Sequence, residues 1–248
     1  MPTGFEGPFR PPLLPVPLGV VLEGYTLISW AIPPERLKGL LPPMFRPATT
    51  VLDGRPVAWF SAFVGRNWLR TVGPFPALPL RFAQLNYRTY VQHADGHGLY
   101  FLKSLVGDPL AAAGLRTLAQ FPADWRPFEY TPTIEGDRLI RVSAKVGPGG
   151  FEANLVAEST GEPPAAAGFP SPEASVAFLG DVGVAAFSRG AGRFGTMISV
   201  HPPLRPEGGR LSHARLAWPV ERGLLTADEV ARPDSVLMQA MVDFPTYV

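Results

Sequence analysis

Short apolar runs separated by proline and glycine dominate the pattern of this chain. Its 248 residues include 30 prolines and 26 glycines, and these residues divide the hydrophobic stretches into pieces of strand length. The spacing predicts a mainly β fold, in which curved antiparallel sheets form a barrel or cone around a pocket, with few peripheral helices. Strands are expected at 20–31, 51–64, 82–93, 98–105, 138–146, 151–158, 194–200, 211–218 and 236–244.

Three segments predict helices. The clearest covers 108–120, where Asp108 can cap the first turn and Pro109 occupies a position that tolerates proline. This helix should pack outside the sheets, with Leu110, Gly114 and Leu118 on one face. Two weaker helices are expected, a short one from Pro34 and another after Ser171 and Pro172.

The connections predict one domain over 1–248, with a proline-rich arm at 1–19. The stretch 159–172 is rich in Gly, Pro and Ala, and neither side of it has enough strands for a complete core, which favours a surface loop over a domain linker. Between His93 and His97, the Asp95-Gly96 pair predicts a tight hairpin turn, because this dipeptide accepts positive φ angles. The flanking strands should therefore pair antiparallel.

Composition excludes several classes of protein. The net charge is +1, from 22 basic and 21 acidic residues without a basic run, so neither nucleic acid nor a membrane surface is an expected partner. The absence of cysteine rules out disulfides and thiolate chemistry. No apolar stretch approaches membrane-spanning length, and a cytoplasmic location is the default expectation. A homo-oligomer is kept as an alternative to a monomer.

Three stretches resemble the YqjF-like family of the acetoacetate decarboxylase-like superfamily. They are WAIPPERLKGLLPPMFRP at 30–47, FAQLNYRTYVQHADGHGLYFLKSLVGDPLAAAGLRTL at 82–118, and HARLAWPVERGLL at 213–225. The resemblance covers most of the chain from Tyr25 onward. It implies a curled antiparallel β architecture that encloses a small pocket, and a ligand such as a small oxo acid or another carboxylate.

The chain departs from the catalytic pattern of that superfamily. In acetoacetate decarboxylases a G-R-E-x-x-G-F-P-type segment precedes a pair of lysines, one of which forms the Schiff base. Here the similar segment at 114–122 is followed by Ala123 and Asp124, and Gln84 stands where those enzymes have a glutamate. Imine chemistry needs a neutral amine, which alanine cannot supply. We therefore expect no Schiff-base decarboxylation of acetoacetate at this position.

The strand at 82–92 alternates between an apolar and a polar face. The polar face carries the expected ligand-binding residues, Gln84, Asn86, Arg88 and Tyr90. One interpretation is a pocket wall in which Arg88 binds a carboxylate. The alternative is an ordinary solvent-exposed sheet face. If Arg88 points inward, a ligand or a carboxylate such as Glu23 or Glu129 should meet it, because an unpaired buried charge is costly.

Two further residues are candidates for catalysis. Lys103 falls on the same strand face as Leu99, Phe101 and Leu105, where desolvation could make its amine nucleophilic, although a bulge or an extended stem would place the amine in water instead. His213 could act as a pocket acid or donor, or could have a structural role. His93 and His97 lack a third ligand at a recognisable spacing, so neither a metal nor another cofactor is expected.

Three functions remain open from the sequence. The first is a small-molecule pocket protein that binds or transforms a small carboxylate. The second is a lyase that uses Lys103 as a relocated amine. The third is a non-catalytic structural or protein-interaction module. A concave site that contains Arg88, Asn86 and Tyr90 would separate the first from the third.

Overall fold

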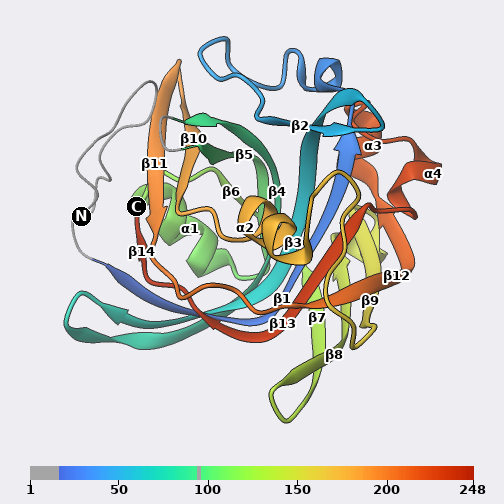
Figure 1. Ribbon diagram of the computed structural model, residues 1–248. Coiled ribbons are helices and arrows are strands. Elements are labelled where there is room, and N and C mark those ends of the chain that lie inside the picture. Colours follow the sequence, from blue (N-terminus) through green and yellow to red (C-terminus); the bar gives the residue numbers. More distant parts are fainter. Residues whose placement is uncertain (1–16, 94–95) are drawn as a thin grey trace.

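The computed structural model describes residues 17–93 and 96–248, with the side chains of 78, 79 and 96 left out (Figure 1). Strands dominate this part of the chain. They are β1 (Leu18–Ile32), β2 (Thr49–Leu52), β3 (Arg55–Val72), β4 (Phe75–His93), β5 (Gly96–Val106), β6 (Ala123–Trp125), β7 (Phe128–Glu135), β8 (Arg138–Val146), β9 (Ala153–Ser159), β10 (Val184–Gly190), β11 (Arg193–Ser199), β12 (Glu207–Leu216), β13 (Ser235–Asp243) and β14 (Thr246–Tyr247). The mainly β fold expected from the sequence is confirmed.

Seven strands close into a barrel. Neighbouring strands pair in the order β3-β4-β5-β10-β11-β14-β1, and β1 pairs with β3 to complete the ring. The ring is visible in Figure 1 as a curved wall that runs from β11 through β5 and β3 to β1. Most of its pairs are antiparallel, but β5 and β10 are parallel. Strands β5 and β10, which lie far apart in the sequence, are therefore neighbours in the ring.

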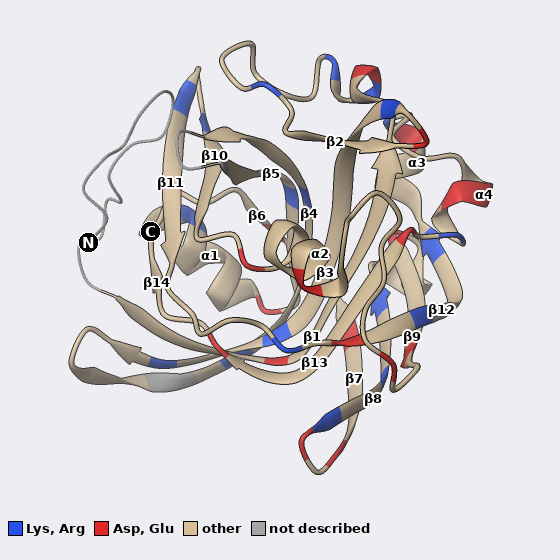
Figure 2. Cartoon of the chain, viewed as in Figure 1, with Lys and Arg blue, Asp and Glu red and all other residues tan. Residues whose placement is uncertain are grey.

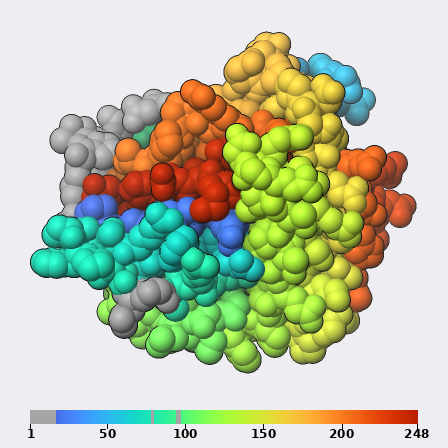
Figure 3. Space-filling view, turned by 90° about the horizontal axis from the view of Figure 1, so that it is seen from below, coloured from blue at the N-terminus to red at the C-terminus, as the bar shows by residue number. Residues whose placement is uncertain are grey.

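A second group of strands extends the sheet outside the ring. Strand β13 pairs with β1, and the order continues through β12, β9 and β8 to β7. Figure 3, seen from below, shows β1, β13 and the β3–β4 hairpin next to one another, with the β7–β8 hairpin beside them. The wall of the ring consequently has a core on each of its two faces.

Alternation along the ring strands separates the two cores. Residues on the inner face include Leu27, Phe63, Tyr90, Phe101 and Phe187, which belong to one buried cluster. Residues on the outer face, next in sequence to several of these, include Ile28, Ala62, Val64 and Leu85, and they pack against the second group of strands. The inner cluster is the part of the barrel in which a ligand site would be enclosed.

Four α-helices and two short 3-10 helices occur in the described residues. They are α1 (Pro109–Thr117), α2 (Pro172–Leu179), α3 (Ala217–Glu221), α4 (Ala227–Val230), η1 (Pro34–Leu37) and η2 (Pro148–Gly150). Asp108 and Ser171 accept hydrogen bonds from the first turns of α1 and α2, as capping residues do. The segment at Pro34 forms the 3-10 turn η1. No described helix has the length and apolar character needed to span a bilayer.

The face of α1 that carries Leu110, Gly114 and Leu118 is not the face that packs on the sheet. Leu110 and Leu118 are exposed, at 72% and 70%, whereas Ala111 and Ala112 are buried against the inner cluster. Alanine lets the helix backbone approach the sheet closely, and the two leucines consequently face solvent.

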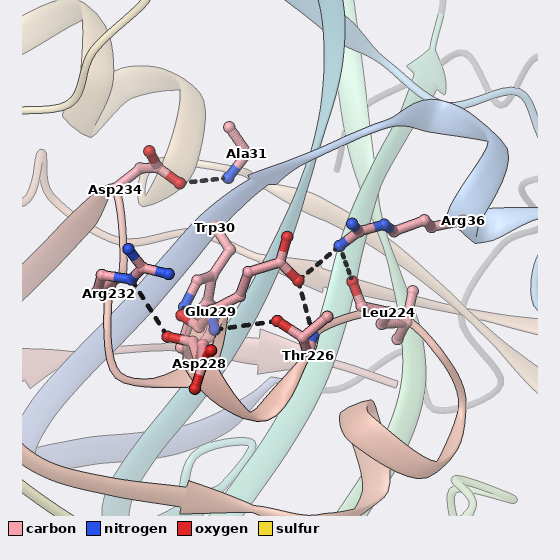
Figure 4. A network of polar contacts seen from close by, with 9 residues as sticks. All are labelled: Trp30, Ala31, Arg36, Leu224, Thr226, Asp228, Glu229, Arg232 and Asp234. Carbon is pink, nitrogen blue, oxygen red and sulfur yellow. Dashed lines mark hydrogen bonds and ion pairs between the residues drawn. The ribbon is translucent and has the colours of Figure 1, made fainter.

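A polar network joins the end of β1 to α4 (Figure 4). Thr226 and Glu229 form a capping box at the start of α4, and the carboxylate of Glu229 also accepts a hydrogen bond from Arg36 Nη1 at 2.8 Å. Trp30 Nε1 donates to the Glu229 carbonyl, and the Asp234 carboxylate accepts from the Ala31 amide. These contacts fix one end of the barrel.

Candidate functional site

The polar face of β4 lies inside the barrel. Gln84, Asn86, Arg88 and Tyr90 are all buried, with exposed fractions between 0% and 7%. The alternative of a solvent-exposed sheet face is therefore wrong. The side chains of Arg88 and Tyr90 lie on the same face of the sheet as the inner-cluster residues of the neighbouring strands, so the ring encloses them.

A chain of amides occupies one end of this polar face. Asn67 Nδ2 donates to Gln84 Oε1 at 2.9 Å, and Gln84 Nε2 donates to Asn86 Oδ1 at 2.9 Å. Gln84, which stands where the decarboxylases are expected to have a glutamate, is thus held by neutral partners. This part of the interior contributes directional hydrogen bonds without a titrating charge.

Arg88 and Tyr90 meet the end of α2. The Leu179 carbonyl accepts hydrogen bonds from Arg88 Nη2 at 3.0 Å and from the Tyr90 hydroxyl at 2.8 Å. The last carbonyls of a helix carry partial negative charge, so they are suitable partners for a buried guanidinium. In Figure 1, α2 lies across the opening of the ring. Its C-terminal end therefore covers the polar site from one side.

Further hydroxyls extend the site along the barrel wall. Tyr90 shares a hydrogen bond with the Ser61 hydroxyl at 2.9 Å, and Ser61 shares another with Ser29 at 2.7 Å. On the other side of Tyr90, a ring nitrogen of His97 lies 2.8 Å from the Phe178 carbonyl. Burial lowers the pKa of His97 below its ordinary value, which favours the neutral ring at pH 7.

Two buried polar atoms in this site lack hydrogen-bond partners among the described residues. They are Arg88 Nε and the hydroxyl of Tyr25. Burial raises the pKa of Tyr25 to about 12, against the opposing effect of the nearby Arg88 charge, so the phenol stays protonated at neutral pH. The Arg88 guanidinium and the Tyr25 phenol contact each other, but not with the geometry of a full hydrogen bond, so both keep hydrogen-bonding capacity that a ligand could use.

Neither expected carboxylate meets Arg88. Glu23 accepts a hydrogen bond from Arg66 Nη1 at 2.8 Å, and Glu129 lies 3.5 Å from Lys145 Nζ. Arg88 is the one charged side chain among the buried residues that the structure describes. Its charge is met inside the barrel by a helix-end carbonyl and by phenols.

The structure places Lys103 away from Arg88. In β4–β5 pairing, Tyr87 faces Lys103 and Arg88 faces Phe101, so Leu102 forms a bulge between them. Beyond the bulge the side chains change faces, and Lys103 does not share a face with Leu99 and Phe101 as the alternation predicted. Its Nζ lies 3.8 Å from the Glu152 carboxylate. The amine is thus held in an ion pair outside the ring.

The remaining candidates also lie outside the inner site. His213 is exposed on β12, a strand outside the ring, and follows a bulge at Ser212 in the pairing of β12 with β9. Of the two roles considered for His213, the pocket acid or donor is therefore wrong. Ala123 is fully buried within the inner cluster, whereas Asp124 is exposed. The position expected for a Schiff-base lysine thus faces the interior, but it carries only a methyl group.

The expected hairpin after His93 is confirmed in its strands, since β4 and β5 pair antiparallel up to His93 and Gly96. Its turn residues, Ala94 and Asp95, lie outside the described residues. Within the described ranges, no group of three or more His, Asp or Glu side chains could hold a metal ion. No sequence pattern marks Tyr25 as a site residue, because its place beside Arg88 depends on the pairing of β1 with β3.

The fold of this barrel is similar to that of acetoacetate decarboxylase-like proteins. Acetoacetate decarboxylase from Legionella pneumophila matches 100% of this chain and 90% of its own, with a TM-score of 0.56 and 12% identity. An acetoacetate decarboxylase-like enzyme from Sphingomonas wittichii RW1 matches 94% and 93% of the two chains, with a TM-score of 0.52 and 12% identity. At such identities the likeness shows the fold alone.

A third similar structure is the enduracididine biosynthesis enzyme MppR, which was determined in complex with pyruvate. It matches 99% of this chain and 91% of its own, with a TM-score of 0.51 and 12% identity. Residues 21–242 match the DUF2071 model, described as an uncharacterized conserved protein. The chain belongs to this family, as the YqjF-like stretches indicated. No curated protein matches the chain.

Proposed function

We propose that this protein binds a small carboxylate, of the oxo acid class, inside the barrel at Arg88. The observation that carries the proposal is a pair of adjacent buried donors, Arg88 Nε and the Tyr25 hydroxyl, neither of which has a partner with full hydrogen-bond geometry in the described residues. A guanidinium binds a carboxylate through charge-assisted hydrogen bonds, and a neutral phenol can donate to a second oxygen. An oxo acid offers both kinds of acceptor within a few atoms.

The electrostatic balance of the interior supports an anionic ligand. Arg88 is buried without a carboxylate partner in the described residues, and the neighbouring amides and hydroxyls are neutral. A negative ligand would offset the desolvation of this charge. Arg88 Nε is not engaged by the Leu179 carbonyl, so a ligand can bind there while Nη2 keeps its contact with α2.

Binding by this route does not require an imine. The Schiff-base position is Ala123, and Lys103 is paired with Glu152 on a different face from Arg88. The similar fold of an enzyme that binds pyruvate is consistent with a small oxo acid ligand here. Binding of the carboxylate at Arg88 therefore involves no covalent step at an amine.

Calorimetric titration with pyruvate and acetoacetate tests the binding. Acetone, which lacks the carboxylate, is the control ligand and should not bind. Tyr25→Phe should weaken the affinity about tenfold, because a hydrogen bond to a charged group is lost. Tyr100→Phe alters a phenol in a separate small cluster with Phe45 and Val91 and should leave the affinity unchanged. Absence of binding to the wild type, or equal affinity for acetone, would contradict the proposal.

Borohydride trapping tests the competing lyase function. The wild type is treated with borohydride in the presence of acetoacetate or pyruvate, followed by intact-mass measurement and peptide mapping. We expect no adduct, since no amine faces the inner cluster in the described residues. A stable adduct on Lys103 that disappears in Lys103→Ala would instead support a relocated Schiff base.

A further inference from the structure

A cleft lined by three arginines opens at a different place on the barrel. It lies between the end of α1 and the β10–β11 hairpin and has a volume of about 430 Å³. Figure 2 shows basic segments of α1, β10 and β11 on the same side of the ring. The lining combines Arg116, Arg189 and Arg193 with the polar Ser188 and Gln120, and with an apolar wall that includes Phe121.

The arginines of this cleft are not neutralised within the described residues. None of the three forms an ion pair there, while other arginines of the chain do, among them Arg36 and Arg138. Two nitrogens of Arg189, Nε and Nη2, are buried and lack a hydrogen-bond partner among described residues. Burial, and then the charge of Arg193, lower the pKa of Arg189. The bare cleft is thus electrostatically unfavourable.

Local structure holds Arg189 in this position. The turn between β10 and β11 uses positive φ angles at 190–192, which places Arg189 and Arg193 on its two sides. The guanidinium of Arg189 lies over the Phe187 ring, 5.4 Å from its centroid. A Cβ atom at Gly195 would come within 2.5 Å of Arg189 Nε, so glycine leaves the space in which this side chain fits.

We propose that this cleft binds a phosphorylated small molecule, with its phosphoryl group between the three arginines. Guanidinium groups match the geometry of phosphate oxygens, and a phosphate monoester carries up to two negative charges, against one for a carboxylate. The cleft also has room beyond a phosphoryl group, and Phe121 and Pro122 form an apolar wall for the organic part. Arg189 and Arg193 flank the β10–β11 turn, and Arg116 comes from α1.

This cleft is separate from the carboxylate site at Arg88. No residue is shared between the cleft lining and the Arg88 cluster, although Phe121 packs on Phe101, which faces Arg88 across the strand pair. The two sites can consequently be tested with different ligands and different variants.

Phenyl phosphate and benzoate are the probes, compared by calorimetry at low salt. Phenyl phosphate should bind to the wild type about tenfold or more tightly than benzoate, because hydrogen bonds between charged groups are strong. The double variant Arg116→Gln/Arg193→Gln should lose this binding. Both side chains are exposed, so the fold should be kept. The double variant Arg55→Gln/Arg222→Gln removes the same charge elsewhere and should bind as the wild type does.

Three results would overturn the assignment. They are no binding of phenyl phosphate to the wild type, equal affinity for benzoate, and equal loss in both double variants. Tyr25→Phe separates the two sites: it should keep full affinity for phenyl phosphate even where pyruvate binding fails. A loss of phenyl phosphate affinity in Tyr25→Phe would place the phosphate in the barrel interior and refute the cleft.

Discussion

Two neighbouring phenols inside the barrel should respond oppositely to the same chemical change. The Tyr90 hydroxyl bonds to the Leu179 carbonyl at 2.8 Å and shares a hydrogen bond with Ser61 at 2.9 Å. The Tyr25 hydroxyl is buried, and its contact with Arg88 falls short of hydrogen-bond geometry. Replacement of either tyrosine by phenylalanine removes one oxygen and retains the ring. The pair therefore isolates the contribution of hydrogen bonding.

The expected magnitudes follow from these contacts. Tyr90→Phe should lower the free energy of unfolding by about 1–3 kcal/mol, because the Ser61 hydroxyl loses a buried partner. Tyr25→Phe should raise it by about 1 kcal/mol, because an unsatisfied buried hydroxyl is removed while the ring packing on Phe63 remains. For a chain of this length, 1 kcal/mol corresponds to a shift of about 2–4 °C in Tm.

Urea unfolding at pH 7 without added carboxylate is the appropriate assay, followed by tryptophan fluorescence and circular dichroism. Both variants should unfold with the m-value of the wild type, since the buried area hardly changes. If Tyr25→Phe destabilises the protein as much as Tyr90→Phe does, the Tyr25 hydroxyl is satisfied, and the main argument for a ligand at Arg88 is lost.

Two further predictions concern the stability of the fold. The Arg36 guanidinium holds the pKa of Glu229 at about 2, so the stabilisation is complete above the unfolded-state value and decreases as pH falls below about 4.5 (Figure 4). Glu229→Gln should cost about 1 kcal/mol at pH 7, after allowance for solvent screening, and clearly less near pH 2, where the carboxyl is about half protonated, in a pH series of urea unfolding. Gly24→Ala should cost about 2–3 kcal/mol, since φ is +68° and the new Cβ would lie 2.2 Å from the Tyr130 hydroxyl. Gly136→Ala has similar strain without a close contact and should cost less in the same assay; equal losses would contradict the steric argument.

Local patterns predicted the strands well and the closure of the barrel poorly. The strand expected at 138–146 has those bounds in β8, and the alternation of β4 was read correctly. Strands β6, β7, β10 and β14 were missed, and the single strand expected at 51–64 is divided between β2 and β3. β7 contains Pro132, which is tolerated because β7 is the last strand in the order, and β14 has only two residues. Pairing of β5 with β10 joins remote segments and leaves no local signal.

The site was predicted in part for the same reason. Alternation identified which residues of β4 share a face, but only the closed ring shows that this face is enclosed. A single bulge at Leu102 moved Lys103 out of the predicted face, and nothing in the residue types marks that bulge. Tyr25 and Leu179 reach Arg88 from segments far along the chain. Their contribution could not be inferred without the tertiary structure.

The charge distribution of the interior is what distinguishes this barrel from an imine-forming site. A Schiff-base amine must be kept neutral by desolvation and a neighbouring cation, and it requires a lysine in the enclosed space. Here the enclosed position is Ala123, the expected carboxylate is the amide Gln84, and the buried cation is Arg88. A guanidinium stays protonated under all ordinary conditions and cannot act as the nucleophile. Its charge can still bind an anion, and two unpaired donors at that point favour recognition of a carboxylate without covalent capture.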